Sequence, residues 1–259
     1  MPFTQKLLLH LHSIPLLFVV IGTSIALACM TTLTTQLVVP YSKRKKNPIS
    51  TTILFGANTL IYSILLTLVL FSAWVGFENA QTNVQKEANC LVELSRDTEA
   101  FLPAIKREIH LLLEEYTKSV INDEWKSLSK SQLNPYTTEI AKKIWKAYSG
   151  FSPKTETEQV FLHEAVNKLY ELRGYRTIRL LDSKTGVFPV LWLLMLLGEI
   201  ATVFSIALFA EDLKSSLAVM FFFGFLVGII LYAIILFDYP YTGDFHVSAD
   251  PLKQMLLYG

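Results

Sequence analysis

Charged residues are scarce in this 259-residue sequence, and those present are gathered in its middle. They make up 17% of the chain, against about a quarter in a typical soluble domain, while hydrophobic residues make up 52%. The chain has 23 basic and 22 acidic residues, and 32 of them fall within residues 78–184, 16 of each sign. This pattern of a polar block between two apolar blocks excludes a soluble enzyme and a disordered chain.

Cysteines and catalytic motifs are also lacking. Cys29 and Cys90 are too few for a disulfide framework, and a net charge of +1 gives no reason to expect a nucleic-acid partner. His163 begins a segment like that of a zinc protease, but Asn167 stands where the second histidine is needed. We therefore expect no enzyme activity, no cofactor and no metal site.

Long apolar runs are abundant. Three runs contain no Lys, Arg, Asp or Glu, and a fourth contains a single acid, Glu199. A helix needs about 20 apolar residues to cross roughly 30 Å of hydrocarbon, and each run is long enough. The sequence therefore predicts four membrane-spanning helices, near residues 14–37, 53–75, 187–210 and 217–237.

The polar block reads as helix almost throughout, because its apolar residues recur three or four positions apart. Pro103 marks a break, and Ser152 with Pro153 is typical of the start of another helix. In that last helix we expect five side chains to face inward: Val160, Phe161, Ala165, Leu169 and Leu172.

These features predict an all-α integral membrane protein with a helical extramembrane domain inserted between its second and third spanning helices. The expected domains are a first membrane hairpin (residues 1–77), the extramembrane domain (78–184), and a second hairpin with a C-terminal tail (185–259). Apolar stripes on the extramembrane helices must be buried on each other or on a neighbouring subunit.

Orientation is predicted from a short loop at residues 43–46, which holds four consecutive basic residues. Short basic loops stay in the cytoplasm. An even number of crossings then places the extramembrane domain on the far side, the periplasm if the membrane is a bacterial inner membrane. Against this orientation, Arg173, Arg176, Arg179 and Lys184 make the flank before the third crossing basic as well.

Glu199 lies near the middle of the third apolar run. A charge at that depth costs about 2.5–3.5 kcal/mol on insertion scales, so such residues usually face a bundle interior or a water-filled path. Available partners are His10, His12, Asn58 and Ser205. Two interpretations stay open: an ion or proton site in a pore, or a protonated packing residue.

Two further motifs involve helix ends and helix packing. Asp238, Pro240 and Gly243 directly follow the fourth run and are typical of a structural turn at the membrane surface, although a functional role stays open. Gly224 and Gly228 are four residues apart and favour close packing of helices. We expect that packing to occur within the subunit rather than to drive a dimer.

Arg173, Arg176 and Arg179 recur every three residues before the third crossing. They predict a basic helical edge that binds anionic lipid head groups or concentrates anions at a pore mouth. The alternative is a solvated face on which these arginines pair with Glu164 or Glu171.

Several short segments together resemble a known family. They are WVGFENA at residues 74–80, EANCL at 87–91, Leu102 with Pro103, NDEW at 122–125, RTIRL at 176–180, PVLW at 189–192, DYPYTG at 238–243 and VSADP at 247–251. Their order and spacing are similar to those of the bacterial bestrophin-like membrane protein family of unknown function.

The resemblance implies an oligomeric channel, because bestrophins are pentameric anion channels with four crossings per subunit. The expected partners are then the lipid bilayer, further copies of the chain, and an ion or small solute. Two departures stand against this: bestrophins hold their large domain in the cytosol, and the sequence has no clear match to their aromatic pore neck. The alternatives are a non-conducting sensor or scaffold whose helical domain binds a partner, and a proton-coupled transporter that uses Glu199.

Overall fold

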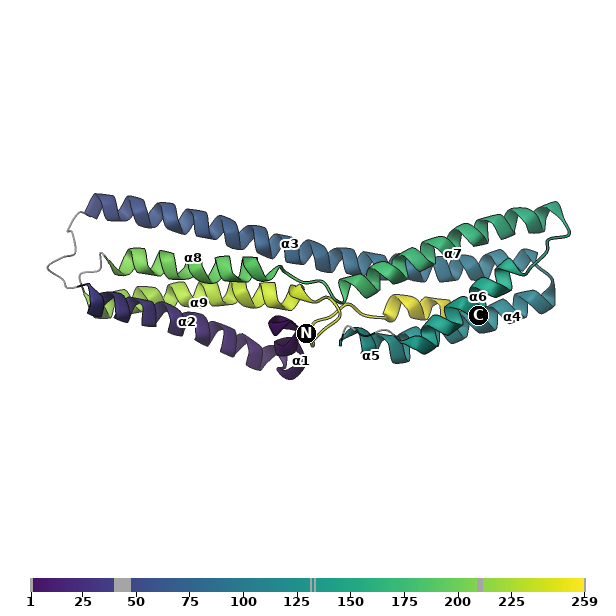
Figure 1. Cartoon of the computed structure of the whole chain (residues 1–259), viewed down its shortest axis with the longest axis horizontal. Helices are drawn as coiled ribbons and strands as arrows, with labels where there is room; N and C mark the ends of the chain where they lie inside the picture. Colours follow the sequence, from purple (N-terminus) through teal and green to yellow (C-terminus); the bar gives the residue numbers. More distant parts are fainter. Residues whose placement is uncertain (1, 40–47, 131, 133, 209–211, 259) are drawn as a thin grey trace. The chain divides into compact units, whose positions relative to one another are not determined.

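The computed structural model describes residues 2–39, 48–130, 132, 134–208 and 212–258. Within these ranges it contains helices and no strands (Figure 1). Four of the helices are long and apolar enough to cross a membrane, so the predicted all-α fold with four membrane helices is confirmed. The basic loop at residues 43–46 lies outside the described residues.

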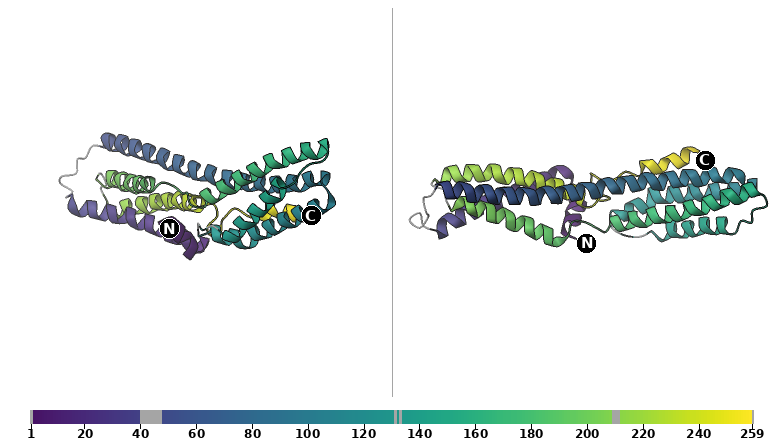
Figure 2. Two further views of the ribbon diagram at one scale, coloured as in Figure 1. Left: turned by 45° about the vertical axis from the view of Figure 1, so that its right-hand side comes forward. Right: turned by 90° about the horizontal axis from the view of Figure 1, so that it is seen from above.

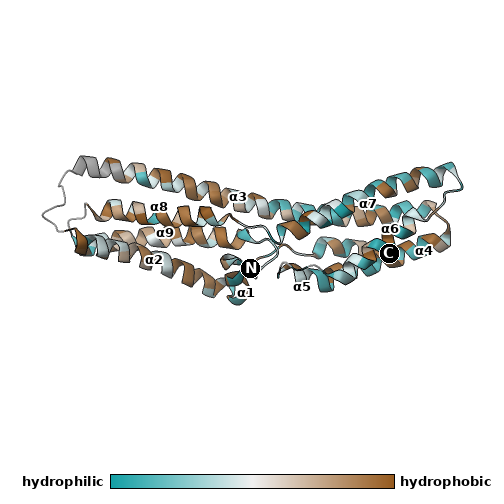
Figure 3. Ribbon diagram, in the orientation of Figure 1, coloured by the Kyte–Doolittle hydropathy of each residue, from teal (hydrophilic) through white to brown (hydrophobic). Residues whose placement is uncertain are grey.

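The chain divides into two compact units. The apolar unit comprises Pro2–Gly76 and Gly186–Asp238, and the polar unit comprises Phe77–Thr185 and Tyr239–Gly259. The long helix α3 (Pro48–Asp97) contributes residues to both units. Figure 3 shows the same division in hydropathy, since α8 and α9 are mostly hydrophobic whereas hydrophilic residues recur along α4 to α7.

The apolar unit is formed by α1 (Phe3–His10), α2 (Ser13–Val38), the first part of α3, α8 (Pro189–Ala207) and α9 (Leu213–Asp238). Helix α2 packs along α9 and also contacts α8 (Figures 1 and 2). Outward side chains of the apolar unit, such as Leu68 of α3, Leu197 of α8 and Phe222 of α9, are apolar and exposed. That surface suits a lipid environment.

Two glycines of α9 bring it unusually close to α2. A Cβ atom added at Gly224 would lie 2.8 Å from Ile25 Cα, and one added at Gly228 would lie 2.7 Å from Ile21 Cα. Real Cβ atoms do not approach a backbone this closely, so only glycine fits at both positions. The close approach that Gly224 and Gly228 permit therefore lies within one chain.

The polar unit contains the second part of α3, α4 (Pro103–Ser119), a π-helical turn (Val120–Glu124), α5 (Trp125–Leu128), α6 (Pro135–Ser149) and α7 (Glu156–Asp182). A 3-10 turn (Asp250–Gln254) and α10 (Met255–Tyr258) follow near its C-terminal end. Its core consists of buried side chains at helical spacing, among them Val84, Leu91, Ile109, Leu113, Ile140, Ile144 and Leu169.

The start of α7 differs from the sequence prediction. Thr155 caps the helix instead of Ser152, because its hydroxyl accepts the Glu158 N–H at 3.1 Å while the Glu158 carboxylate accepts the Thr155 N–H at 3.3 Å. Ala165, Leu169 and Leu172 are buried as expected, but Val160 and Phe161 are exposed.

Candidate functional site

Glu199 is the centre of a polar cluster inside the apolar unit. It projects from α8 and is 1% exposed. The Ser24 hydroxyl of α2 donates a hydrogen bond to Glu199 Oε1 at 2.7 Å. The second carboxyl oxygen, Oε2, is buried and has no hydrogen-bond partner among the described residues. The carboxyl group is thus held on one side only.

Tyr62 of α3 lies beside this cluster. Its ring packs on the α8 backbone next to Glu199, since a Cβ atom at Gly198 would be 2.6 Å from Tyr62 Cδ2. The ring centroids of Tyr62 and Phe223 of α9 are 6.4 Å apart. The Tyr62 hydroxyl is also buried and lacks a hydrogen-bond partner in the described part of the chain. Helices α2, α3, α8 and α9 therefore all contribute to the surroundings of Glu199.

The partner of Glu199 is not among those the sequence suggested. Asn58 and Ser205 instead bond to each other, with Asn58 Nδ2 donating to Ser205 Oγ at 2.5 Å. The His10 ring instead forms a hydrogen bond between its Nδ1 and the Lys6 carbonyl oxygen at 2.8 Å. A buried carboxyl bonded to one neutral hydroxyl is costly to ionise unless a cation comes to it.

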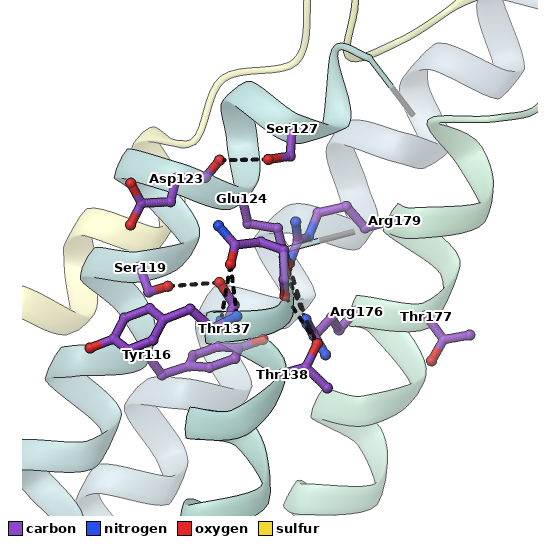
Figure 4. Close-up of polar contacts among 12 residues, drawn as sticks. Tyr116, Ser119, Asp123, Glu124, Ser127, Thr137, Thr138, Arg176, Thr177 and Arg179 are labelled. Atoms are coloured by element: carbon purple, nitrogen blue, oxygen red, sulfur yellow. Dashed lines mark hydrogen bonds and ion pairs between the residues drawn. The ribbon is translucent and has the colours of Figure 1, made fainter. Parts of the chain in front are cut away.

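A second polar centre lies in the polar unit and is built around Arg179 of α7 (Figure 4). Arg179 is fully buried. Its Nε donates to Glu87 Oε2 at 2.7 Å, and its Nη2 donates to Glu87 Oε1 at 3.0 Å and to Glu124 Oε1 at 2.8 Å. The Tyr116 hydroxyl donates to Glu87 Oε1 at 3.1 Å.

Arg176 extends this centre by one helical turn. Its Nη2 donates to Glu124 Oε2 at 2.6 Å and to Thr138 Oγ1 at 3.0 Å, as Figure 4 shows. Two arginines thus face two glutamates, which we call the buried ion network (Glu87, Glu124, Arg176 and Arg179). Arg179 also lies 5.2 Å from the centroid of the Trp125 ring, a favourable contact for a guanidinium.

The charges in the buried ion network stabilise one another. Burial alone would raise the pKa of Glu124, but hydrogen bonds and positive charge from Arg176 and Arg179 outweigh it and hold that pKa below its ordinary value. Burial alone would lower the pKa of Arg179, and the charges of Glu87 and Glu124 reverse this and raise it. Glu124, Arg176 and Arg179 are therefore charged at neutral pH.

The three arginines expected to form a basic edge do not share one environment. Arg173 is exposed, Arg176 is mostly covered, and Arg179 is fully buried. The acids that pair with Arg176 and Arg179 are Glu87 and Glu124, rather than Glu164 or Glu171. A basic edge of three accessible guanidinium groups is therefore absent from the described residues.

Four of the segments that resemble the family meet in this unit. Glu87, Glu124 and Arg179 come from three of them, and Trp125 Nε1 donates to the Val247 carbonyl oxygen, in a fourth, at 3.1 Å. The Tyr241 ring packs edge-on to Trp125 at 5.7 Å. All four residues of the buried ion network lie in segments that resemble the family, and this is the sequence signal by which the network could have been identified.

The C-terminal motif forms a turn after α9. Asp238 ends that helix and is buried, and its carboxylate accepts the Val187 N–H at 2.5 Å. The carbonyl oxygen of Pro240 accepts the Val247 N–H at 2.8 Å. Gly243 has a φ of 88°, a left-handed conformation that favours glycine. The Pro240–Val247 hydrogen bond closes the turn, and the Asp238 carboxylate ties the end of α9 to the segment before α8.

Comparisons with known proteins agree with the fold. A family model described as the bestrophin-like domain matches residues 22–252. A bacterial bestrophin homologue from Klebsiella pneumoniae, solved with a tyrosine-to-alanine substitution, is 13% identical, with 93% of this chain and 97% of that chain covered and a TM-score of 0.68. The same homologue with an isoleucine-to-threonine substitution is 14% identical, with 93% and 98% covered and a TM-score of 0.68. No curated protein matches the sequence.

Proposed function

The chain belongs to the bestrophin-like family, and from that premise we propose that it forms an oligomeric ion channel that conducts anions across a lipid bilayer. The observation that carries this proposal is the family match over residues 22–252, together with four apolar helices able to span a membrane. Bestrophin-like proteins are known as anion channels rather than enzymes. A transport role therefore fits the family and the apolar helices.

Exposed apolar side chains of the polar unit support the oligomer. Val160, Ile178 and Leu181 of α7 and Leu111 of α4 are all exposed. Large apolar surfaces outside a membrane are usually covered by another protein surface. In an oligomer, neighbouring copies of this chain would cover them.

The placement in the membrane is part of the same proposal. Residues 78–184 form the extramembrane domain between the hairpins at 1–77 and 185–259, and the membrane is a bacterial inner membrane. The basic loop at residues 43–46 favours a cytoplasmic position for that loop and a periplasmic one for the domain.

Within the channel, Glu199 is a proton- or cation-responsive group. Support comes from its one-sided hydrogen bond to Ser24 and from the unpaired hydroxyl of Tyr62 beside it. Tyr62 is the other titratable side chain in this cluster; α2 contributes the neutral Ser24 and α9 contributes Phe223. Binding of a proton or cation would neutralise the carboxylate and change the charge that a passing ion meets.

Flux from liposomes tests the proposal. Purified full-length protein is reconstituted, and chloride efflux is recorded with a fluorescent chloride indicator, with empty liposomes as the blank. We expect chloride flux that depends on protein, and we expect Glu199→Gln to weaken its dependence on pH while flux persists. Folded protein without chloride or cation flux would contradict the channel and favour the non-conducting sensor or scaffold. An unchanged pH dependence in the variant would remove the role of Glu199 alone.

A further inference from the structure

The polar unit contains a cavity of about 500 Å³ between α6 and α7. This volume is within the range of about 300–1,000 Å³ that is usual for small-molecule sites. Its apolar lining comes from Tyr116, Ile144, Leu169 and Leu172, which are buried, and from Trp145, which is partly exposed. The Trp145 ring packs edge-on to Tyr170 at 5.1 Å, so that it is supported on one side.

The charged side chains that line the cavity are all basic. They are Lys142, Lys146, Arg173 and Arg176, and no Asp or Glu lines it. Arg176 is held by Glu124, and Lys142 pairs with Glu139 at 2.6 Å. Lys146 and Arg173 form no ion pair in the described part of the chain. The cavity therefore combines an apolar lining with two basic side chains that form no ion pair, although the Glu139 carboxylate interacts with Lys146 at longer range.

We propose that this cavity is a binding site for an organic anion, a molecule with an aromatic or aliphatic body and one carboxylate, sulfonate or phosphate group. The body packs against Ile144, Trp145, Leu169 and Leu172. The acidic group is held by Lys146 and Arg173, because charge-assisted hydrogen bonds to such groups are strong. Two nitrogens of Arg176 already donate to Glu124 and Thr138, so this residue contributes positive charge near the acidic group rather than a direct contact from those nitrogens.

This site does not include Glu199, the group proposed to respond to protons or cations in the channel. Every residue that lines the cavity belongs to the polar unit, whereas Glu199 belongs to the apolar unit. The binding measurement therefore needs no flux. A protein that conducts without binding the probe, or binds it without conducting, would distinguish the two proposals.

Equilibrium dialysis tests the site with the full chain in nanodiscs of phosphatidylcholine, a zwitterionic lipid that adds no anionic competitor. The probe is 1-naphthalenesulfonate, and empty nanodiscs are the blank. We expect saturable binding of one probe per chain. The neutral 1-naphthalenemethanol and the cationic 1-naphthylmethylammonium should bind roughly tenfold more weakly or worse, because they lose the charged contacts. Equal binding of the three, or no saturable binding, would overturn the proposal.

Variants locate the probe. Lys146→Glu combined with Arg173→Glu should weaken binding roughly tenfold or more, whereas Lys143→Glu, an exposed lysine on α6 outside the cavity lining, should leave it unchanged. Ala141→Trp should abolish binding by filling the cavity without changing its charge. Full affinity in the double variant and in Ala141→Trp would overturn the proposal. If the double variant does not fold, Ala141→Trp and the charge series on the unaltered chain decide the question.

Discussion

A single buried residue, Arg179, joins the helices of the polar unit. It forms ion pairs with two acids from distant parts of the chain, Glu87 on α3 and Glu124 in the π-helical turn. Burying these charges costs desolvation free energy, which their mutual attraction offsets only while every member is present. One Arg179 nitrogen, Nη1, is buried without a hydrogen-bond partner in the described residues, so the network has little redundancy.

Replacing Arg179 with Met should therefore destabilise the protein severely. The change leaves Glu87 buried without its cation, and breaking a buried ion pair in this way costs about 3–5 kcal/mol. We expect the melting temperature to fall by roughly 10 °C or more, measured by circular dichroism in detergent. Arg173→Met, an exposed change on the same helix, is the control and should melt within about 2 °C of the unaltered protein. A similar melting temperature for both variants would contradict the role given to Arg179.

The lowered pKa of Glu124 predicts that the folded protein loses stability in acid. Its pKa is lowered in the folded protein, so the stability it contributes is fully present above the unfolded value of about 4.3 and is lost as pH falls below it. Glu124→Gln cannot titrate, and it should melt lower than the unaltered protein at neutral pH and converge with it in acid. Melting curves recorded over this range check the prediction. A constant difference at every pH would show that the charge of Glu124 is not what stabilises the fold.

At this scale the sequence shows which residues are unusual but not which of them meet. Glu199 stands out because it is the one acid in its apolar run. Its hydrogen bond to Ser24 spans 175 positions, and no periodicity reveals such a pair. In the alternative of a solvated face, Glu164 and Glu171 are the expected partners of the arginines, because acids on the same helix are visible in a sequence. The acids that pair with Arg176 and Arg179 are Glu87 and Glu124, which lie on other elements and become visible as partners only in the folded chain.

Among the elements, the apolar helices are the most predictable part of the molecule. The expected crossing at residues 14–37 corresponds to α2 (Ser13–Val38), and that at 217–237 to α9 (Leu213–Asp238). Uninterrupted apolar length is enough to define such helices. In α7, helical spacing predicted the inward face correctly at Leu169 but not at Val160, because periodicity does not show how far neighbouring helices extend along that face.

The contact between α2 and α9 depends on the size of single residues. Gly228→Ala should place a Cβ atom 2.7 Å from Ile21 Cα, which forces the helices apart at a cost of about 1–3 kcal/mol. Gly22→Ala on α2 is the matched control, because nothing lies within 4 Å of a Cβ atom there. We expect the first variant to melt lower and the second to melt at or above the original temperature, by fluorescence-detected size-exclusion after heating. Equal losses in both would show that the close approach is unimportant.

For the whole molecule, the fold is preserved at very low sequence identity. Homologous structures only 13–14% identical cover 93% of this chain with TM-scores of 0.68. So few shared residues preserve helix lengths and packing while ion selectivity, gating and subunit number are free to change.

The membrane orientation predicted from this sequence differs from that of bestrophins, which hold their large domain in the cytosol. The four positive charges at residues 43–46 favour a cytoplasmic loop. Tyr239–Gly259 belongs to the polar unit, so a reporter fused after residue 259 follows that unit. We expect alkaline phosphatase fused there to be active and green fluorescent protein to be dark in bacterial cells.

Neutralising the loop is the control that ties the result to its cause. Replacing all four basic residues at 43–46 with Gln removes the charge that holds the loop in the cytoplasm, leaving Arg173 and Lys184 as the basic flank of the third crossing. Part of the protein should then insert in the opposite orientation, so that the phosphatase fusion loses activity and the green fluorescent protein fusion gains fluorescence. A fluorescent, phosphatase-negative fusion of the unaltered chain would place the polar unit in the cytosol. The flank before the third crossing would then outweigh the short loop, and the orientation would agree with that of bestrophins.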